Sequence, residues 1–137
     1  MIQIYFLSIA LNLLTGYILV FGNEDYNPEE TVPGFSLRNE KFRLILGIAT
    51  MAVGLLKILS VTDGDVRVVG DLLPAAAGLV SGFILLYEYF KNHTTIKWDN
   101  EGKTSVQLIL MQNRKIIGIA AIVIAILHFL FPRVLFL

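Results

Sequence analysis

The sequence predicts an all-α, polytopic membrane protein: a four-transmembrane-helix bundle built from two parallel helical-hairpin repeats. The 137-residue chain is 55% hydrophobic and only 16% charged, with a mean hydropathy of +0.70. This composition lies well to the apolar side of an ordinary soluble domain. Four stretches are long and apolar enough to cross a bilayer core of about 30 Å, which takes roughly 20 helical residues. The first two stretches also resemble the last two in sequence.

The four expected spans cover about residues 2–21, 42–61, 71–90 and 115–136 of a single integral membrane domain, residues 1–137. No charged side chain lies in the first span. The second carries Arg43 near its start and Lys57 near its end. The third is uncharged from Leu72 to Tyr87, and in the fourth His128 is the one ionisable group between Ile116 and Phe131.

The first span could be mistaken for a secretory signal peptide. It lacks a basic leading segment, it contains Gln3 and Asn12, and no small-residue cleavage pattern follows Phe21. We therefore expect a retained helix.

The connections differ in character. Pro28 and the Pro33-Gly34 pair indicate a loop after the first span. Residues 94–98 and 103–107 flank a glycine-containing turn and are typical of a small β-hairpin.

Two pairs of similar segments indicate an internal repeat. LLTGYILVF at 13–21 matches LVSGFILLY at 79–87 at an offset of 66 residues, and Gly16 pairs with Gly82. RLILGIATMAVGLLKIL from Arg43 matches RKIIGIAAIVIAILHFL from Arg114 at an offset of 71. The alternative is that any two apolar helices look alike, because few residue types occur in them. A two-span unit returns the chain to its starting side, so a copy has the same orientation and the repeat is parallel.

The charges predict an orientation. Eight basic residues lie in or beside the two longer connections, and few lie on the opposite side; the eight are Arg38, Lys41, Arg43, Lys91, Lys97, Lys103, Arg114 and Lys115. By the positive-inside rule these connections are cytoplasmic, so both termini lie outside a cytoplasmic (inner) membrane.

Each span has small or short polar residues at helical spacing. Helices in lipid associate by close approach through such residues, because burial of apolar surface gains little there. We expect the following residues to pack helix against helix: Ser8, Asn12, Gly16, Gly47, Thr50, Gly54, Gly78, Gly82, Gly118, Ala121 and Ala125.

Lys57 and His128 occupy matched positions of the second and fourth spans. An ionisable group inside a membrane is costly and is often functional. Lys57 is near enough to its helix end to reach water by snorkelling, and a neutral His128 could bond to a neighbouring helix. If both faced the bundle axis, they would form a candidate anion or lipid site, with Asp71 as a counter-ion.

No sequence feature indicates an enzyme. The His-Glu-x-x-His and Gly-x-Ser-x-Gly motifs are absent, and the chain has no cysteine, so we expect no catalytic residues, metal ligands or cofactor. The formal charge is zero, which gives no reason to expect a nucleic-acid partner.

We expect a non-catalytic accessory or assembly subunit whose partners are the lipid bilayer and other membrane proteins or its own copies. The alternative is a homo-oligomeric carrier or pore for a small solute, an anion among the candidates.

The orientation can be tested because the chain has no native cysteine. Single cysteines at Asn27, Asp65 and Asn100 would be treated on intact cells with a maleimide that does not cross membranes. Only the position of Asp65 should react, because the other two lie on the predicted cytoplasmic side. Reaction at the other two positions, with residue 65 silent, would reverse the orientation.

Overall fold

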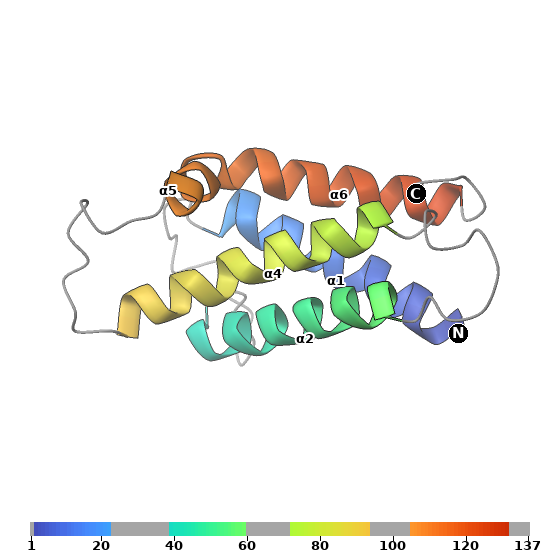
Figure 1. Cartoon of the computed structure of the whole chain (residues 1–137), viewed down its shortest axis with the longest axis horizontal. Helices are drawn as coiled ribbons and strands as arrows, with labels where there is room; N and C mark the ends of the chain where they lie inside the picture. The colour runs from blue at the N-terminus through green and yellow to red at the C-terminus, as the bar shows by residue number, and fades with distance from the viewer. Residues whose placement is uncertain (1, 23–38, 60–71, 94–104, 132–137) are drawn as a thin grey trace, which may run out of the picture.

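The computed structural model describes residues 2–22, 39–59, 72–93 and 105–131, and these residues are almost entirely helical. The described residues form helices α1 (Ile2–Phe21), α2 (Glu40–Leu59), α4 (Leu72–His93), α5 (Ser105–Gln112) and α6 (Arg114–Leu130), which are labelled in Figure 1. The all-α class predicted from the sequence is confirmed.

Three of these helices are long and apolar enough to cross a membrane: Gln3–Phe21, Glu40–Leu59 and Leu72–His93. Membrane association is therefore indicated by length and composition together. The fourth expected span, 115–136, corresponds to the 17-residue helix α6 and continues past the last described residue. That it crosses the membrane stays a prediction.

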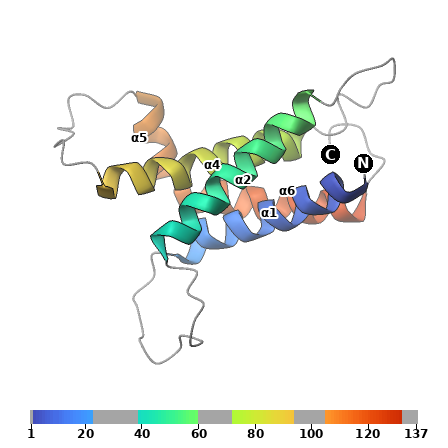
Figure 2. The ribbon, with the colours of Figure 1, turned by 90° about the horizontal axis from the view of Figure 1, so that it is seen from below.

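The four longer helices lie side by side and alternate in direction along the chain (Figure 1). The most extensive contacts join α2 to α4 and α1 to α6, and smaller ones join α1 to α4 and α4 to α6. Figure 2 shows these helices from below. We call the end where α1 and α4 finish the Glu88 end, and the end where α2 and α6 finish the His128 end.

Glycines stand where the helices of each close pair cross. A Cβ atom on Gly16 would lie 2.7 Å from the Gly118 carbonyl oxygen, and one on Gly82 would lie 2.9 Å from that of Gly47. Real Cβ atoms do not occupy such positions, so only glycine permits these backbone approaches. Van der Waals contact between backbones is the kind of interaction that holds helices together in lipid.

A layer of apolar side chains fills the interior toward the Glu88 end. Ile18 and Leu19 of α1 and Ile84 and Leu85 of α4 are each only 1% exposed, and Leu46 of α2 joins them. These residues come from three helices, so the layer closes the space between them. Partly buried residues, Leu110 and Met111 of α5 among them, pack against it.

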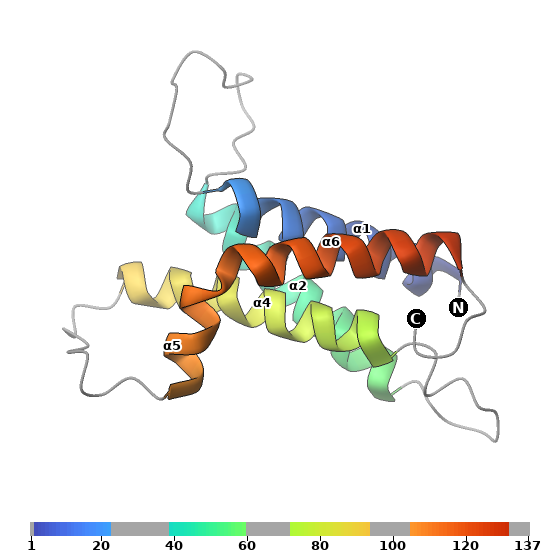
Figure 3. The same cartoon turned by 90° about the horizontal axis from the view of Figure 1, so that it is seen from above.

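The predicted β-hairpin is wrong where it can be compared with the structure. Ser105, which the hairpin assigns to its second strand, begins helix α5, and residues 106 and 107 are helical too. Figure 3 shows α5 turned sharply away from the axis of α6. The helix brings Leu110 and Met111 to the apolar layer, and this tertiary contact outweighs the local turn signal. Residues 94–104 lie outside the described residues.

The glycine crossings predict the response to larger side chains. Gly16→Leu and Gly82→Leu should each destabilise the protein by about 1–3 kcal/mol or prevent folding, because backbone atoms occupy the space the new side chain needs. Thermal unfolding in detergent would measure this. Ala120→Leu, at an exposed position of α6, is the control and should change stability by less than about 0.5 kcal/mol. A harmless Gly16→Leu beside a severe Gly82→Leu would show that the two crossings are not comparable.

Candidate functional site

The eleven residues expected to pack helix against helix are all buried in the structure. Gly47 and Gly54 of α2 face α4, since a Cβ on Gly54 would lie 3.0 Å from the Ala75 carbonyl oxygen. Gly78 of α4 lies beside Asn12 of α1 and near Thr50 of α2. The other six members of the set are the crossing glycines Gly16, Gly82 and Gly118 together with Ser8, Ala121 and Ala125.

Most polar groups in the middle of the molecule bond within the bundle. Asn12 Nδ2 donates to the Pro74 carbonyl oxygen at 2.9 Å, linking α1 to α4. Thr15, Thr50 and Ser81 each donate a hydroxyl to the carbonyl four residues earlier in their own helix. The Ser81 and Thr15 hydroxyl oxygens lie 3.5 Å apart. Self-satisfied hydroxyls of this kind are typical of helix packing.

A basic pair lies buried at the His128 end. Lys57 is 5% exposed and His128 is 1% exposed, and Lys57 Nζ lies 2.9 Å from His128 Nε2. The sequence left open whether these residues face the bundle axis or the surroundings. The structure turns them toward each other across α2 and α6, so the interpretation of Lys57 as a snorkelling side chain is wrong.

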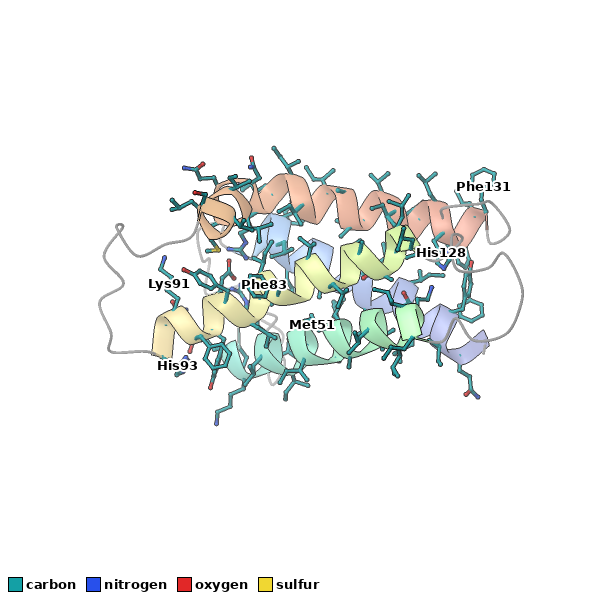
Figure 4. The ribbon with its side chains drawn as sticks, viewed as in Figure 1. Met51, Phe83, Lys91, His93, His128 and Phe131 are labelled. Carbon is teal, nitrogen blue, oxygen red and sulfur yellow. The ribbon has the colours of Figure 1, made fainter. Side chains whose placement is uncertain are left out.

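Tyr5 of α1 completes this cluster. Its hydroxyl donates to the His128 carbonyl oxygen, and its ring lies 4.6 Å from the imidazole ring between centroids. Lys57 Nζ lies 5.7 Å from the centre of the Tyr5 ring, within the range of a cation–π contact. Figure 4 shows His128 at the end of the molecule opposite to His93. Asp71, the counter-ion expected from the sequence, lies outside the described residues.

The Lys57–His128 contact fixes a relation between the protons of the two groups. An ammonium group only donates, and an imidazolium donates from both nitrogens, so the two fully protonated forms cannot share this hydrogen bond. The hydrogen bond needs an N–H on one nitrogen and a lone pair on the other, so at least one of the two groups is neutral in this arrangement.

A second charged group, which the sequence analysis did not single out, lies at the Glu88 end. Glu88 of α4 accepts from Arg114 of α6 at 2.8 Å and lies 3.8 Å from Arg43 of α2. The three side chains are about one-tenth exposed. The matched arginines of the second and fourth spans were the available signal, since two cations converging in a membrane protein call for a nearby acid.

The two arginines also bond to the end of α1. Arg43 Nη2 donates to the Gly22 carbonyl oxygen at 2.6 Å, and Arg114 Nη2 donates to that of Ile18 at 3.3 Å. The carbonyls at the carboxyl end of a helix carry partial negative charge, so cations stabilise them; the Ile18 carbonyl also accepts the Gly22 N–H at 2.8 Å. The charged cluster therefore ties three helices to the carboxyl end of α1.

A pocket of about 220 Å³ opens beside this cluster. Its polar lining consists of Gly22, Glu40, Arg43, Glu88, Tyr89 and Asn92. Asn92 Nδ2 donates to Glu40 at 3.3 Å, and His93 Nε2 lies 3.3 Å from the other oxygen of Glu40. Within the described ranges, no three histidine, aspartate or glutamate side chains converge as a metal site would require.

A protein-family model matches residues 1–128 of the chain. The chain belongs to that family. It is also similar to an uncharacterized protein of Treponema pallidum (strain Nichols), with 27% identity over 137 residues and all of both chains covered. No solved structure matches it. These similarities identify relatives of the chain and name no activity.

The basic pair predicts energetic coupling between α2 and α6. Lys57→Met and His128→Leu should each lower the free energy of unfolding by about 1–3 kcal/mol, because each leaves a buried polar group without this hydrogen bond. The double variant should lose clearly less than the sum of the two. Unfolding in detergent would measure all three. Lys41→Met, at an exposed position of α2, is the control and should be nearly silent. Additive losses would mean that the contact contributes no coupling.

Proposed function

We propose that the chain is a four-span bundle of two parallel hairpin repeats in the cytoplasmic membrane, with both termini outside. Burial supports the repeat. Adding 66 to the number of each buried residue of α1 gives the buried residues of α4: positions 8, 9, 12, 15, 16, 18 and 19 become 74, 75, 78, 81, 82, 84 and 85. Chance likeness of apolar helices gives no reason for buried faces to coincide at all seven positions.

Contacts between matched residues support the same proposal. Ser81 lies against Thr15, 66 positions away, and His128 lies against Lys57, 71 positions away. A residue meets its own equivalent only near a two-fold axis. The Gly16–Gly118 and Gly82–Gly47 crossings are likewise equivalent under these offsets.

We propose a non-catalytic accessory or assembly role within the membrane. The closed interior is the observation that carries this proposal: Ile18, Leu19, Ile84 and Leu85 fill the axis, and hydroxyls nearer its middle bond to their own helices. A close-packed interior holds the helices in fixed positions and leaves little room for a solute. In contrast, every membrane-length helix exposes large apolar side chains, for example Phe6, Ile48, Leu55 and Phe83. Such surfaces suit lipid and other membrane helices.

A homo-oligomeric carrier or pore for a small solute is the second candidate, and the buried Lys57–His128 pair favours it. Basic groups held inside a membrane protein often mark a path for ions or protons. This reading requires Asn12, Thr50, Lys57 and His128 to line one wetted cavity. Asn12 and Thr50 are instead engaged with the Pro74 and Leu46 carbonyl oxygens, which favours the accessory role.

Purification in a mild detergent separates the two roles. We expect the full-length protein to retain another membrane protein at a fixed ratio, because an assembly subunit is held by complementary helix packing. Mass spectrometry of the purified complex and its size would measure this. A homo-oligomer without any other protein would contradict the accessory role.

A second comparison tests the carrier directly. Uptake of an anionic solute, and the amount of copurified anionic lipid, would be compared for wild type, Lys57→Met and His128→Phe. Equal values for all three proteins would remove the anion site and leave the pair as a structural contact.

A further inference from the structure

The pocket at the Glu88 end is lined by positively and negatively charged side chains at different depths. Arg43 and Glu88 form its deeper part, and their side chains are each 13% exposed. Glu40 and Asn92 lie about one helical turn farther toward the end of the molecule, and the Glu40 side chain is 51% exposed. The pocket therefore offers a guanidinium at depth and a carboxylate with an amide at its rim.

This order matches one class of membrane ligand. In an amine-bearing glycerophospholipid the phosphate is attached to the glycerol, next to the acyl region, and the amine lies beyond the phosphate in the headgroup. Residues three apart on a helix face the same side, so Glu40 and Arg43 are placed to meet the two ends of a short headgroup. The surrounding helices expose Phe21, Ile45 and Phe90 to the outside, which suits acyl chains.

We propose that this pocket binds a phosphoethanolamine group, as carried by phosphatidylethanolamine. Arg43 binds the phosphate oxygens, since a guanidinium matches their geometry. Its Nη1 lies 3.8 Å from Glu88, near the limit of an ion pair, and Glu88 is held more closely by Arg114 at 2.8 Å. A guanidinium has five N–H donors, so a phosphate oxygen can bind Arg43 in addition to its present contacts while Glu88 keeps its closer partner.

Glu40 and Asn92 at the rim of the pocket favour a primary ammonium over a trimethylated one. The Glu40 carboxylate already accepts an N–H from Asn92 and lies 3.3 Å from the exposed His93 Nε2, so it is oriented to receive nitrogen donors. A primary ammonium donates hydrogen bonds to the carboxylate and to the Asn92 amide oxygen, whereas a trimethylated one has no N–H to donate. An anionic headgroup without an amine would meet two carboxylates, Glu40 and Glu88, and gain less.

This inference uses the membrane location argued above but not the accessory role, so a failed search for partner proteins would leave it intact. Native mass spectrometry of the full-length protein would compare phosphatidylethanolamine, phosphatidylcholine and phosphatidylglycerol at equal concentrations in detergent. Phosphatidylethanolamine should bind about five- to tenfold more tightly than the other two. Equal binding of all three lipids would overturn the proposal.

Variants of the rim residues test whether the preference for phosphatidylethanolamine arises in this pocket. Glu40→Gln and Asn92→Ala change exposed side chains and should abolish the preference for phosphatidylethanolamine while leaving thermal stability nearly unchanged. Lys41→Gln, which removes a neighbouring exposed charge, should keep the preference. A preference that survives both rim variants would overturn the assignment, as would its loss in the Lys41 control.

Soluble glycerophosphoethanolamine distinguishes the source of the group. Failure of this compound to compete would show that acyl chains contribute, as expected for a lipid. Competition at equal concentration would identify a soluble ester as the ligand of the same pocket. Arg43→Gln should weaken all three lipids alike if the protein folds, and the rim variants test the site independently of that outcome.

Discussion

The approach of helix backbones at two glycine crossings is the constraint on which the other packing depends. Gly16 faces the Gly118 carbonyl, and Gly82 faces that of Gly47, at distances that no side chain could share. Once backbones lie this close, the residues beside the crossings must also be small or short, as Thr15, Ser81 and Ala121 are. Because lipid is as apolar as the helix surfaces, shape complementarity here replaces the hydrophobic effect that would drive packing in water.

Close packing in the middle leaves the charged groups at the two ends of the molecule. Toward the Glu88 end an apolar layer made by Ile18, Leu19, Ile84 and Leu85 separates the hydroxyls of Thr15 and Ser81 from the arginines. The ends differ in chemistry: one holds a lysine in contact with a histidine, and the other holds a glutamate between two arginines. Both groups connect helices that are distant in sequence, so both help fix which helices are neighbours.

Periodicity and composition predicted the helical class, the extents of the first three long helices to within a few residues, and the small residues that are now seen to be buried. They could not predict which partner each residue meets. Lys57 is four residues from the end of the predicted second span, 42–61, and that position alone favours snorkelling; only the placement of α6 puts His128 Nε2 within 2.9 Å of Lys57 Nζ. Glu88 was overlooked because it lies in the last turns of an otherwise apolar span. Helix α5 was not predicted because the local turn signal favours a hairpin there, whereas the packing of Leu110 and Met111 against the apolar layer cannot be read from the local sequence.

The proposed repeat also explains why the pocket opens on one side. Under the offset of 66, Glu88 corresponds to Gly22, so the two equivalent arginines meet different groups. Arg114 reaches a carboxylate, whereas Arg43 reaches the backbone carbonyl of Gly22, where a Cβ would lie 2.5 Å from its Nη2. One acid thus serves two cations, and it sits closer to Arg114 than to Arg43. A single carboxylate thus makes the two helix pairs of the proposed repeat unequal, and Arg43 is the arginine that lies on the wall of the pocket.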